Sequence, residues 1–232
     1  MTRPISAREE RSEEAGIVPA PTTVLVIDFD GTITERDTLE LIVDEFGDPD
    51  VRRRTEARLG SSLSLQEVIA AQYGSVRAPL AEVVAWTLRI VRFRPGLQEL
   101  VGQGAARGWQ TTVVSSGIRE VIEPLLAREG FESLDIVANS VEPDPAGWRV
   151  RFRDVEACSV CGETCKRSAV SRLAEGGSLI YVGDGYSDGC AAEAADRIFA
   201  RRRLITYLEE RGLAFERFED LLDIARRLRG DD

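Results

Sequence analysis

Short runs of β-branched and other apolar residues recur along the chain and predict the strands of a buried sheet. The first run, residues 23–27, is too short for a helix and is apolar on both faces, as a central parallel strand requires. Similar runs follow at 110–114, 134–138 and 178–182, with a weaker one at 197–200. Between them, helical periodicity covers 96–107, 118–129, 166–174, 189–195 and 203–212. This alternation predicts an α/β fold with a parallel sheet and helices on both of its faces.

Two stretches interrupt the alternation. Residues 38–93 show helical periodicity and no strand run, which predicts a small all-helical insert after the first strand, between the core segments 22–37 and 94–232. The second stretch has turn residues over 143–147 before an alternating segment, which predicts a hairpin. Residues 1–21 are charged and contain no apolar run, so we expect a disordered lead-in rather than a signal peptide.

The composition excludes several kinds of chemistry. The chain has 30 Lys and Arg against 40 Asp and Glu, a net charge of −10, which argues against nonspecific nucleic-acid binding because such binding needs a basic face. The chain has no histidine, which excludes a Ser-His-Asp triad, a Cys-His pair and zinc sites with histidine ligands. Acid–base chemistry must therefore come from carboxylates, Lys, Tyr, Cys or a metal-bound water.

The four cysteines are expected to be thiols or metal ligands rather than disulfides. No apolar run approaches the roughly 20 residues that span a membrane, so we expect a cytoplasmic protein with no membrane partner, in a reducing compartment. Cys158, Cys161 and Cys165 have the spacing of metal ligands, and Cys190 follows in a later loop. Four thiolates around Zn²⁺ would connect the two loops, and half-buried free thiols are the alternative.

Pairs of acidic residues follow two of the predicted strands. Asp28 and Asp30 come directly after the first run, and Asp184 and Asp188 follow the run at 178–182. Ligands of open α/β sheets bind at the carboxyl ends of the strands. On an extended backbone Asp28 and Asp30 would point the same way and repel each other without a cation. An Asp-rich turn explains either pair alone, but it does not explain two matching pairs.

A hydroxyl group and a lysine add to the acidic pairs. The second predicted strand ends in Ser115, Ser116 and Gly117 before a helix, where a hydroxyl and free backbone N–H groups form an anion site or simply cap the helix. Lys166 is the single lysine among 30 basic residues and opens the helix before the strand at 178–182. A compact ammonium can do what a planar guanidinium cannot, so Lys166 is a candidate functional residue.

The order and spacing of Asp28 and Asp30, Ser115, Lys166, and Asp184 and Asp188 resemble the haloacid-dehalogenase-like superfamily of phosphatases, from residue 24 to about 229. The resemblance implies a Rossmann-like fold and a Mg²⁺-dependent phosphatase that acts on a small soluble phosphomonoester. In that reading Asp28 is the nucleophile that forms an aspartyl-phosphate, and Asp30 protonates the leaving alcohol and then activates water.

The same resemblance implies roles for the other residues. Asp28, the backbone carbonyl of Asp30, and Asp184 would hold Mg²⁺. Ser115, with the amides of Ser116 and Gly117, would bind the phosphoryl oxygens. Lys166 would neutralise the phosphate and the nucleophile, and Asp188 would support both Lys166 and the metal's water ligands.

The helical insert resembles the cap of the phosphoserine-phosphatase-like branch of this superfamily. Within this branch, a cluster of cysteines directly before the lysine, as at Lys166, resembles two groups of enzymes. They are the methionine-salvage phosphatases and the phosphoethanolamine/phosphocholine phosphatases. Residues 198–204 also resemble the methionine-salvage group. Phosphoserine phosphatases usually have Glu where this chain has Asp37 and lack the cysteine loop, which argues against serine phosphate as the substrate.

Several alternatives stay open at this stage. A mutase of the same fold would move the phosphoryl group between hydroxyls, and a sensor would bind a phosphorylated metabolite without turnover. A pure binder has no use for the proton donor Asp30, which argues against a sensor. Asp37 is the best candidate for contacting the substrate, since its carboxylate could receive an ammonium or a hydroxyl. Weaker candidates are Arg52, Arg53, Arg54, Arg58 and Trp86, since an Arg run on a surface helix is more often solvated charge than a binding site.

Overall fold

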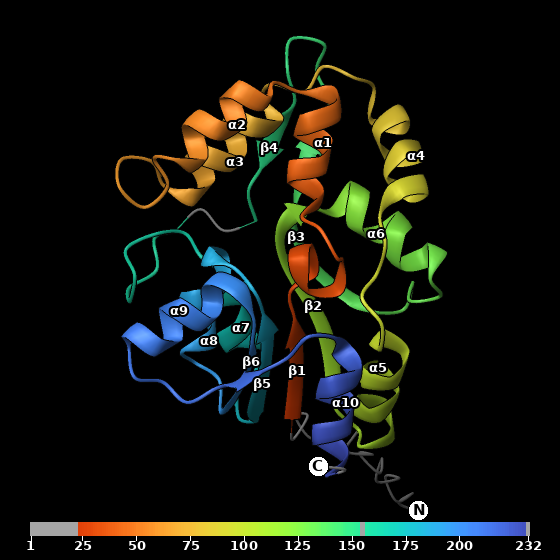
Figure 1. The fold of residues 1–232 in the computed structure, drawn as a ribbon, viewed down its shortest axis with the longest axis vertical. Coiled ribbons are helices and arrows are strands. Elements are labelled where there is room, and N and C mark those ends of the chain that lie inside the picture. The colour runs from red at the N-terminus through yellow and green to blue at the C-terminus, as the bar shows by residue number, and fades with distance from the viewer. Residues whose placement is uncertain (1–22, 154–155, 231–232) are drawn as a thin grey trace, which may run out of the picture.

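The computed structural model describes residues 23–153 and 156–230, so the predicted lead-in over 1–21 lies outside the described residues. Its centre is a sheet made of β1 (Thr23–Ile27), β2 (Gln110–Ile118), β3 (Asp135–Glu142), β4 (Arg149–Arg151), β5 (Ser178–Gly183), β6 (Arg197–Ala200) and β7 (Glu216–Arg217). Among the described residues the strand order is β4-β3-β2-β1-β5-β6-β7, and neighbours are parallel except β3 and β4 (Figure 1). The sheet is mostly parallel, as predicted.

The strand β1 lies in the middle of the sheet and is buried on both faces. It pairs in parallel with β2 on one side and with β5 on the other. Leu25 and Ile27 pack into a hydrophobic cluster on one face of the sheet, whereas Val24 and Val26 pack into a second cluster on the opposite face. Because successive side chains of a strand point to opposite faces, burial on both faces requires the continuous apolar run that predicted this strand.

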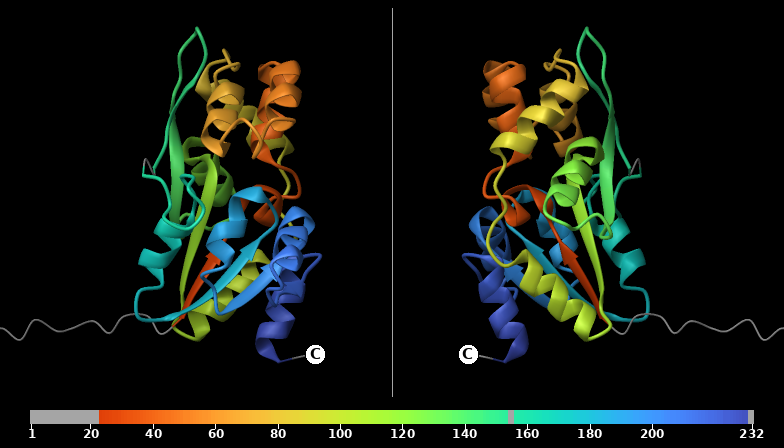
Figure 2. Two further views of the ribbon diagram at one scale, coloured as in Figure 1. Left: turned by 90° about the vertical axis from the view of Figure 1, so that its left-hand side faces the viewer. Right: turned by 90° about the vertical axis from the view of Figure 1, so that its right-hand side faces the viewer.

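Helices cover both faces of the sheet (Figures 1 and 2). One face carries α5 (Leu97–Ala106), α6 (Arg119–Arg128) and α10 (Leu221–Arg229). The other carries α7 (Arg167–Leu173), α8 (Gly189–Ala192) and α9 (Arg202–Glu210). This arrangement confirms the predicted α/β class.

Four further helices form a layer above the carboxyl ends of the central strands (Figure 1). They are α1 (Thr38–Phe46), α2 (Pro49–Glu56), α3 (Leu65–Tyr73) and α4 (Leu80–Ile90), and together we call them the helical layer. Asp37 accepts hydrogen bonds from the second and third backbone N–H groups of α1, and Ser64 and Glu67 form a capping box at the start of α3. The two connections to the sheet lie side by side, because Thr34 and Phe93 form a β-bridge.

The hairpin of β3 and β4 ties the helical layer to the sheet, and it confirms the hairpin predicted from the turn residues. Trp148, on this hairpin, is buried, stacks on Tyr73 of α3 with ring centroids 6.2 Å apart, and donates from Nε1 to the carbonyl of Ala78 at 2.9 Å. Gly147 has φ +133°, and a Cβ there would lie 2.1 Å from the carbonyl oxygen of Gly74. Only glycine therefore allows this close approach.

The structure differs from the sequence-based boundaries at several places. β2 continues to Ile118, so α6 begins at Arg119, and α8 ends at Ala192 rather than at 195. β7 and α10 were not predicted. β7 has only two residues, too few for a pattern, whereas α10 does carry a readable signal in its capping box of Asp220 and Asp223.

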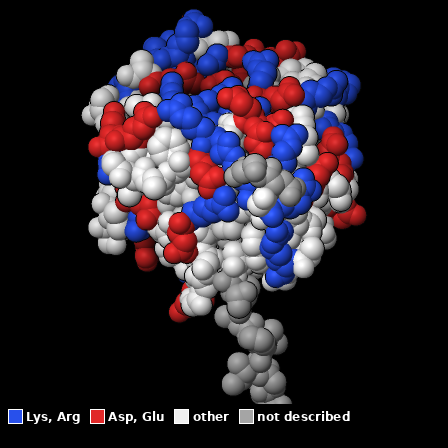
Figure 3. All heavy atoms as spheres, turned by 60° about the horizontal axis from the view of Figure 1, so that its bottom comes forward, with Lys and Arg blue, Asp and Glu red and all other residues white. Residues whose placement is uncertain are grey.

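The surface mixes charges of both signs. On the face that Figure 3 shows, basic and acidic side chains are interspersed, and the basic ones do not form one continuous patch. No helix of the described residues is both long enough and apolar enough to cross a bilayer.

Candidate active site

The site is centred on Asp28, which follows β1 directly. The backbone N–H of Asp28 donates to the carbonyl of Val182 at 2.9 Å, so the pairing of β1 with β5 fixes its position. Its side chain is only 4% exposed. The carboxylate of Asp28 is buried because it directly follows β1, which lies in the middle of the sheet.

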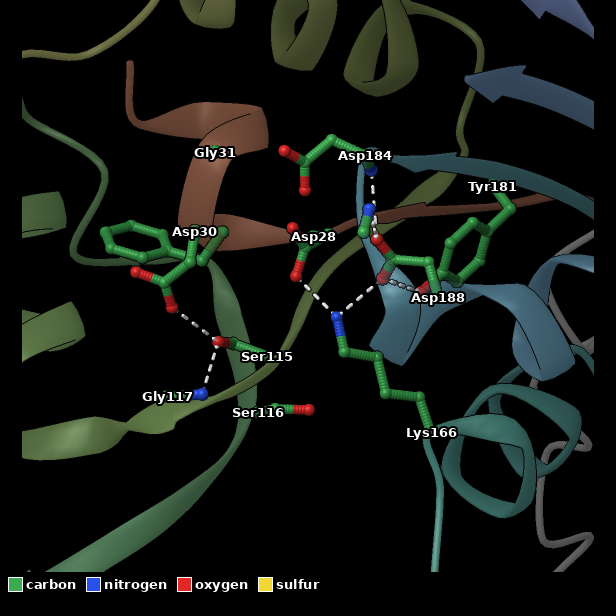
Figure 4. Close-up of polar contacts among 12 residues, drawn as sticks. Asp28, Asp30, Gly31, Ser115, Ser116, Gly117, Lys166, Tyr181, Asp184 and Asp188 are labelled. Atoms are coloured by element: carbon green, nitrogen blue, oxygen red, sulfur yellow. Dashed lines mark hydrogen bonds and ion pairs between the residues drawn. The ribbon is translucent and has the colours of Figure 1, made fainter. Parts of the chain in front are cut away.

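Lys166 donates a hydrogen bond to the carboxylate of Asp28 and lies below it in Figure 4. It lies at the N-terminus of α7 and is fully buried. Its Nζ donates to Oδ1 of Asp28 and, at 2.7 Å, to Oδ1 of Asp188. Burial by itself lowers the pKa of Lys166, but the attraction of Asp188 and Asp28 outweighs this and raises the pKa above its ordinary value. Lys166 is therefore a charged ammonium between two carboxylates.

Asp188 supports the other residues and has both of its oxygens occupied. Oδ1 accepts from Lys166 and, at 2.8 Å, from the hydroxyl of Tyr181. Oδ2 accepts from the backbone N–H groups of Asp184 and Gly185 at 2.9 and 2.8 Å. These four bonds orient Lys166 and the loop that carries Asp184, which is the supporting place that the resemblance implies.

Three buried carboxylates meet at this edge of the sheet. Ligand oxygens of Asp28, Asp184 and Asp188 all lie within 4.8 Å of one another. Burial, with repulsion by Asp188 and Asp184, raises the pKa of Asp28 well above its ordinary value. Burial and Asp188 raise the pKa of Asp184 to about 7. Three carboxylates against the ammonium of Lys166 and the half-exposed guanidinium of Arg202 leave an excess of negative charge, and an oxygen-rich site of this kind fits a hard divalent cation such as Mg²⁺.

Asp30 lines the same pocket as Asp28 but has different partners. Its Oδ1 accepts from the backbone N–H and the hydroxyl of Thr38 at 2.9 and 2.6 Å, and its Oδ2 accepts from Oγ of Ser115 at 3.2 Å. The predicted repulsion between Asp28 and Asp30 needs correction, because the carboxylates that raise the pKa of Asp28 are Asp188 and Asp184. After Asp28 the chain enters a tight turn, Phe29–Ile33, rather than continuing as a strand.

Ser115, Ser116 and Gly117 also line the pocket, just before the start of α6. They belong to β2, whose register with β3 shifts between Val114 and Ile118, and the helix follows at Arg119, one residue later than predicted. Oγ of Ser115 accepts from the backbone N–H of Gly117 at 2.8 Å. The irregular end of β2 therefore carries the hydroxyl and the amides, as expected from the sequence.

Asn139 is a supporting residue that the sequence did not reveal. It lies in β3 and is buried, and its side-chain N–H group donates to the carbonyl of Ser116 at 2.7 Å. Its Oδ1 accepts from the backbone N–H of Arg153 at 3.2 Å, and Arg153 in turn donates to the carbonyl of Ser115 at 2.6 Å. These bonds fix the backbone of the irregular segment.

A pocket of about 560 Å³ opens between this edge of the sheet and the helical layer. On the side of the helical layer and its connections it is lined by the apolar residues Leu39, Leu59, Leu65, Val68 and Ile69 and by the polar residues Asp37, Glu40, Glu56 and Gln72. Asp37 is thus at the pocket, as predicted, but its Oδ1 already accepts from the backbone N–H groups of Leu39 and Glu40 at 2.8 and 3.1 Å.

The other candidate substrate-contacting residues are not among those that line this pocket, namely Arg52, Arg53, Arg54, Arg58 and Trp86. Arg52 pairs with Asp44 and Glu56, and Trp86 packs edge-on against Phe46 with ring centroids 5.3 Å apart. Arg52 and Trp86 instead connect α2 and α4 to α1.

Arg202 is a pocket residue that the sequence analysis did not single out. Its Nη1 lies 3.5 Å from Oδ2 of Asp184, and its φ of +47° is the only positive value for a non-glycine residue in the described parts of the chain. A left-handed arginine costs of the order of 1 kcal/mol or more, and such conformations cluster at functional sites. The charge of Arg202 therefore faces the opening above Asp184.

The four cysteines also come together, at the side of Lys166. Cys158, Cys161, Cys165 and Cys190 have their sulfur atoms within 4.8 Å of one another, and none forms a disulfide. We call these four residues the cysteine cluster.

Gly31 offers a test of how tightly the acidic residues are packed. Its φ is +76°, and a Cβ there would lie 2.3 Å from Oδ2 of Asp184, whereas Gly108 has a similar φ of +70° with open space around it. We expect Gly108→Ala to lower the free energy of unfolding by about 1 kcal/mol and to leave turnover unchanged. Gly31→Ala should cost the same strain and also displace Asp184, so that turnover falls at least about fivefold, or about 1 kcal/mol of barrier. Urea denaturation and steady-state kinetics on both variants measure these effects. Equal turnover of the two variants would contradict a close contact between Gly31 and Asp184.

Comparisons with known proteins agree with this geometry. The family model of haloacid dehalogenase-like hydrolases matches residues 25–193. A 2-hydroxy-3-keto-5-methylthiopentenyl-1-phosphate phosphatase of Geobacillus kaustophilus (strain HTA426) is 32% identical over 216 residues, which cover 88% of this chain and 96% of the relative. Polyol phosphate phosphatase PYP1 of Saccharomyces cerevisiae (strain ATCC 204508 / S288c) is 29% identical over 87% of this chain and 90% of its own length.

Solved structures show the same fold. A phosphoserine phosphatase described as a phospho-aspartyl intermediate analogue aligns with a TM-score of 0.70, at 18% identity, over 89% of this chain and 99% of its own. The family-model match over residues 25–193 and the relative that is 32% identical over 88% of the chain establish that the chain belongs to the haloacid dehalogenase-like hydrolase family.

Proposed function

We propose that this protein is a phosphatase that hydrolyses a small phosphomonoester through an aspartyl-phosphate on Asp28. The observation that carries the proposal is the environment of Asp28, a buried carboxylate that lines the pocket and is held at one oxygen by the fully buried Lys166. The family membership and the phosphatase names of the relatives support it.

Asp28, Asp30 and Ser115 line the pocket, and Lys166 lies buried against Asp28. Asp28 attacks phosphorus, so that a bond forms between its carboxylate oxygen and phosphorus while the ester P–O bond breaks. Asp30 gives a proton to the leaving alkoxide and then takes one from the water that attacks the phosphorus of the intermediate. Ser115 and the backbone N–H groups beside it bind phosphoryl oxygens, and the ammonium of Lys166 offsets their charge. The products are the alcohol and inorganic phosphate.

We propose Mg²⁺ as the cation of this site. Asp28 and Asp184 are the carboxylates that would hold it, with the carbonyl of Asp30 as the third protein ligand that the family resemblance implies. Asp188 is unsuited to direct binding because all four of its hydrogen bonds are made within the protein. When bound, Mg²⁺ would neutralise charge on the phosphoryl group and orient it.

Removing Asp184 should abolish the response to magnesium. We expect saturating Mg²⁺ to raise the Tm of the wild type by roughly 5 °C or more, because a ligand at 100 times its Kd stabilises by about 2.7 kcal/mol. Asp184→Asn should shift by less than about a fifth of that, since one carboxylate ligand is lost. The control is Glu210→Gln, an exposed acid at the far end of α9, which should behave as the wild type. Equal shifts of the Tm in all three proteins would show that Asp184 does not bind magnesium.

We propose that the helical layer, within the insert 38–93, acts as a cap that selects the substrate. Part of its pocket-facing side is an apolar wall of Leu39, Leu65, Val68 and Ile69 opposite the acidic edge of the sheet, beside the polar residues Asp37, Glu40, Glu56 and Gln72. Such a wall fits an ester with a short apolar tail. 2-Hydroxy-3-keto-5-methylthiopentenyl-1-phosphate, the substrate that the names of several relatives give, has a tail of this kind.

A substrate panel tests this assignment. We expect kcat/KM for the methylthiopentenyl ester to exceed that for phosphoserine, phosphoethanolamine, phosphocholine and a polyol phosphate at least about tenfold, or about 1.4 kcal/mol. A charged substitution in the apolar wall, Val68→Asp, should remove this preference but leave the hydrolysis of p-nitrophenyl phosphate measurable. A preference for another ester of the panel would mean that the proposed substrate is wrong. Transfer of the phosphoryl group without release of free phosphate would indicate a mutase. Binding without turnover would indicate a sensor.

The remaining expectations about the cell stay predictions. They are a cytoplasmic location and the absence of nucleic-acid and membrane partners. They follow from the negative net charge and from the lack of an apolar run long enough to span a membrane.

A further inference from the structure

The cysteine cluster joins two segments that are distant in the sequence. Cys158, Cys161 and Cys165 lie in the segment before α7, and Cys190 lies in α8. The sulfurs of Cys158 and Cys190 are 3.8 Å apart, and all four lie within 4.8 Å of one another. In a tetrahedral site with Zn–S bonds of about 2.3 Å, neighbouring sulfurs are about 3.8 Å apart. The cluster therefore has nearly the dimensions of such a site.

The backbone around Cys158 is folded as a tight turn. The N–H of Gly162 donates to the carbonyl of Cys158 at 2.8 Å, and the N–H of Cys158 donates to the carbonyl of Glu163 at 2.9 Å. Gly162 has φ +76°, which allows the chain to reverse directly after Cys161. The N–H of Val160 donates to the sulfur of Cys158 at 3.4 Å. An N–H donor to sulfur stabilises a thiolate, which is the form that binds a metal.

Hydrophobic packing does not account for the shape of this loop. Val160 is 56% exposed, and its neighbours Ser159, Cys161 and Gly162 are exposed as well. Buried thiols that merely fill a core are surrounded by apolar side chains, whereas here the sulfurs face one another under an exposed loop. Four mutually close sulfurs under such a loop need a partner that all of them can share.

We propose that the cysteine cluster binds one structural Zn²⁺. Thiolate ligands select soft or borderline cations over Mg²⁺, and a site of four sulfurs in tetrahedral arrangement is typical of zinc. All four positions are filled by the protein, which leaves no place for substrate or a reactive water. Binding would release the protons of the thiols that are still protonated, and no oxidation or reduction is involved.

The position of this ion would give it a role in the active site. Cys165 directly precedes Lys166, and Cys190 follows Asp188 by two residues. The ion would therefore fasten together the two segments whose side chains form the buried ion pair between Lys166 and Asp188. This position is distinct from the carboxylate cluster proposed for Mg²⁺.

Metal analysis of the full chain, purified without chelators, tests the proposal. We expect about one zinc per chain in the wild type and in the control Ser159→Ala, which changes an exposed residue of the same loop. In Cys161→Ser we expect less than about a tenth of this content, because one of four ligands is lost. A wild type that contains no zinc and takes up none when Zn²⁺ is supplied would overturn the proposal, as would iron in place of zinc or a disulfide among the four cysteines.

Cobalt substitution gives a second measurement that does not depend on how the variants fold. Co²⁺ added to metal-free wild-type protein should give the intense visible absorption of tetrahedral thiolate coordination, and one equivalent of Zn²⁺ should abolish it. A spectrum typical of octahedral oxygen coordination would contradict a site of four sulfurs. Neither measurement uses hydrolysis, so a failure of the proposed phosphatase activity would leave the zinc result unaffected.

Discussion

Asp28→Asn is expected to lower kcat for p-nitrophenyl phosphate at least about a thousandfold, or about 4 kcal/mol, because an amide cannot replace the carboxylate that attacks phosphorus. The fold should survive. Burial and the neighbouring carboxylates raise the pKa of Asp28, so its charge opposes folding at neutral pH, and Lys166 keeps Asp188 as a partner. We therefore expect the Tm in EDTA not to fall.

The control for this variant is Asp135→Asn, which changes an exposed acid at the first residue of β3, the end of that strand away from the site. It should keep the wild-type kcat. If Asp28→Asn retained more than about a tenth of the wild-type turnover, less than about 1.4 kcal/mol of transition-state stabilisation would be lost, and Asp28 could not be the nucleophile.

Lys166→Arg is expected to lower kcat/KM at least about tenfold, or about 1.4 kcal/mol, although it keeps the positive charge. Nζ of Lys166 is in contact with Asp28 and Asp188 at once, and the side chain is fully buried. A guanidinium is larger and planar, so it would displace one of the two carboxylates. Steady-state kinetics with p-nitrophenyl phosphate measure the effect, and Arg167→Lys, a change at the adjacent half-buried residue, is the control.

The same substitution should also destabilise the protein. Arginine and lysine have similar helix propensity, so the place of Lys166 at the start of a helix predicts no effect on folding, whereas its complete burial predicts a loss of stability. Enlarging a buried side chain costs typically about 1–3 kcal/mol, which chemical denaturation measures. Near-normal activity and stability together would mean that a compact ammonium is not needed at this place.

The positions of the main site residues could be predicted because of the way the sheet is built. β1, β2 and β5 are neighbours and parallel, so the residues that follow them must meet at one edge. Asp28, Ser115 and Asp184 each come at the end of an apolar run, which is visible without a structure. Their convergence is therefore a consequence of strand order, which the resemblance to the superfamily implied.

The supporting residues could not be predicted in this way. Tyr181 reads as one more apolar strand residue, and its hydrogen bond to Asp188 depends on how the loop after β5 folds back. Asn139 is a polar residue inside β3, and its bond to the carbonyl of Ser116 depends on the register shift between the two strands. Arg202 lies in the stretch 198–204 that resembles the methionine-salvage group, but within that stretch only its backbone conformation and its place beside Asp184 distinguish it from Arg201 and Arg203.

The most direct test of the proposed mechanism is to find the phosphoryl group on Asp28. Asp30→Asn should be mixed with p-nitrophenyl phosphate and Mg²⁺ and quenched in acid, and its peptides should be analysed by mass spectrometry. The nitrophenolate leaves without needing a proton, so the aspartyl-phosphate forms, and its hydrolysis is slow without the base Asp30. We predict one phosphoryl group on the peptide that contains Asp28, and none when Asp28→Asn is added. Turnover with no phosphoryl group on this peptide, or with one on another residue, would contradict the mechanism.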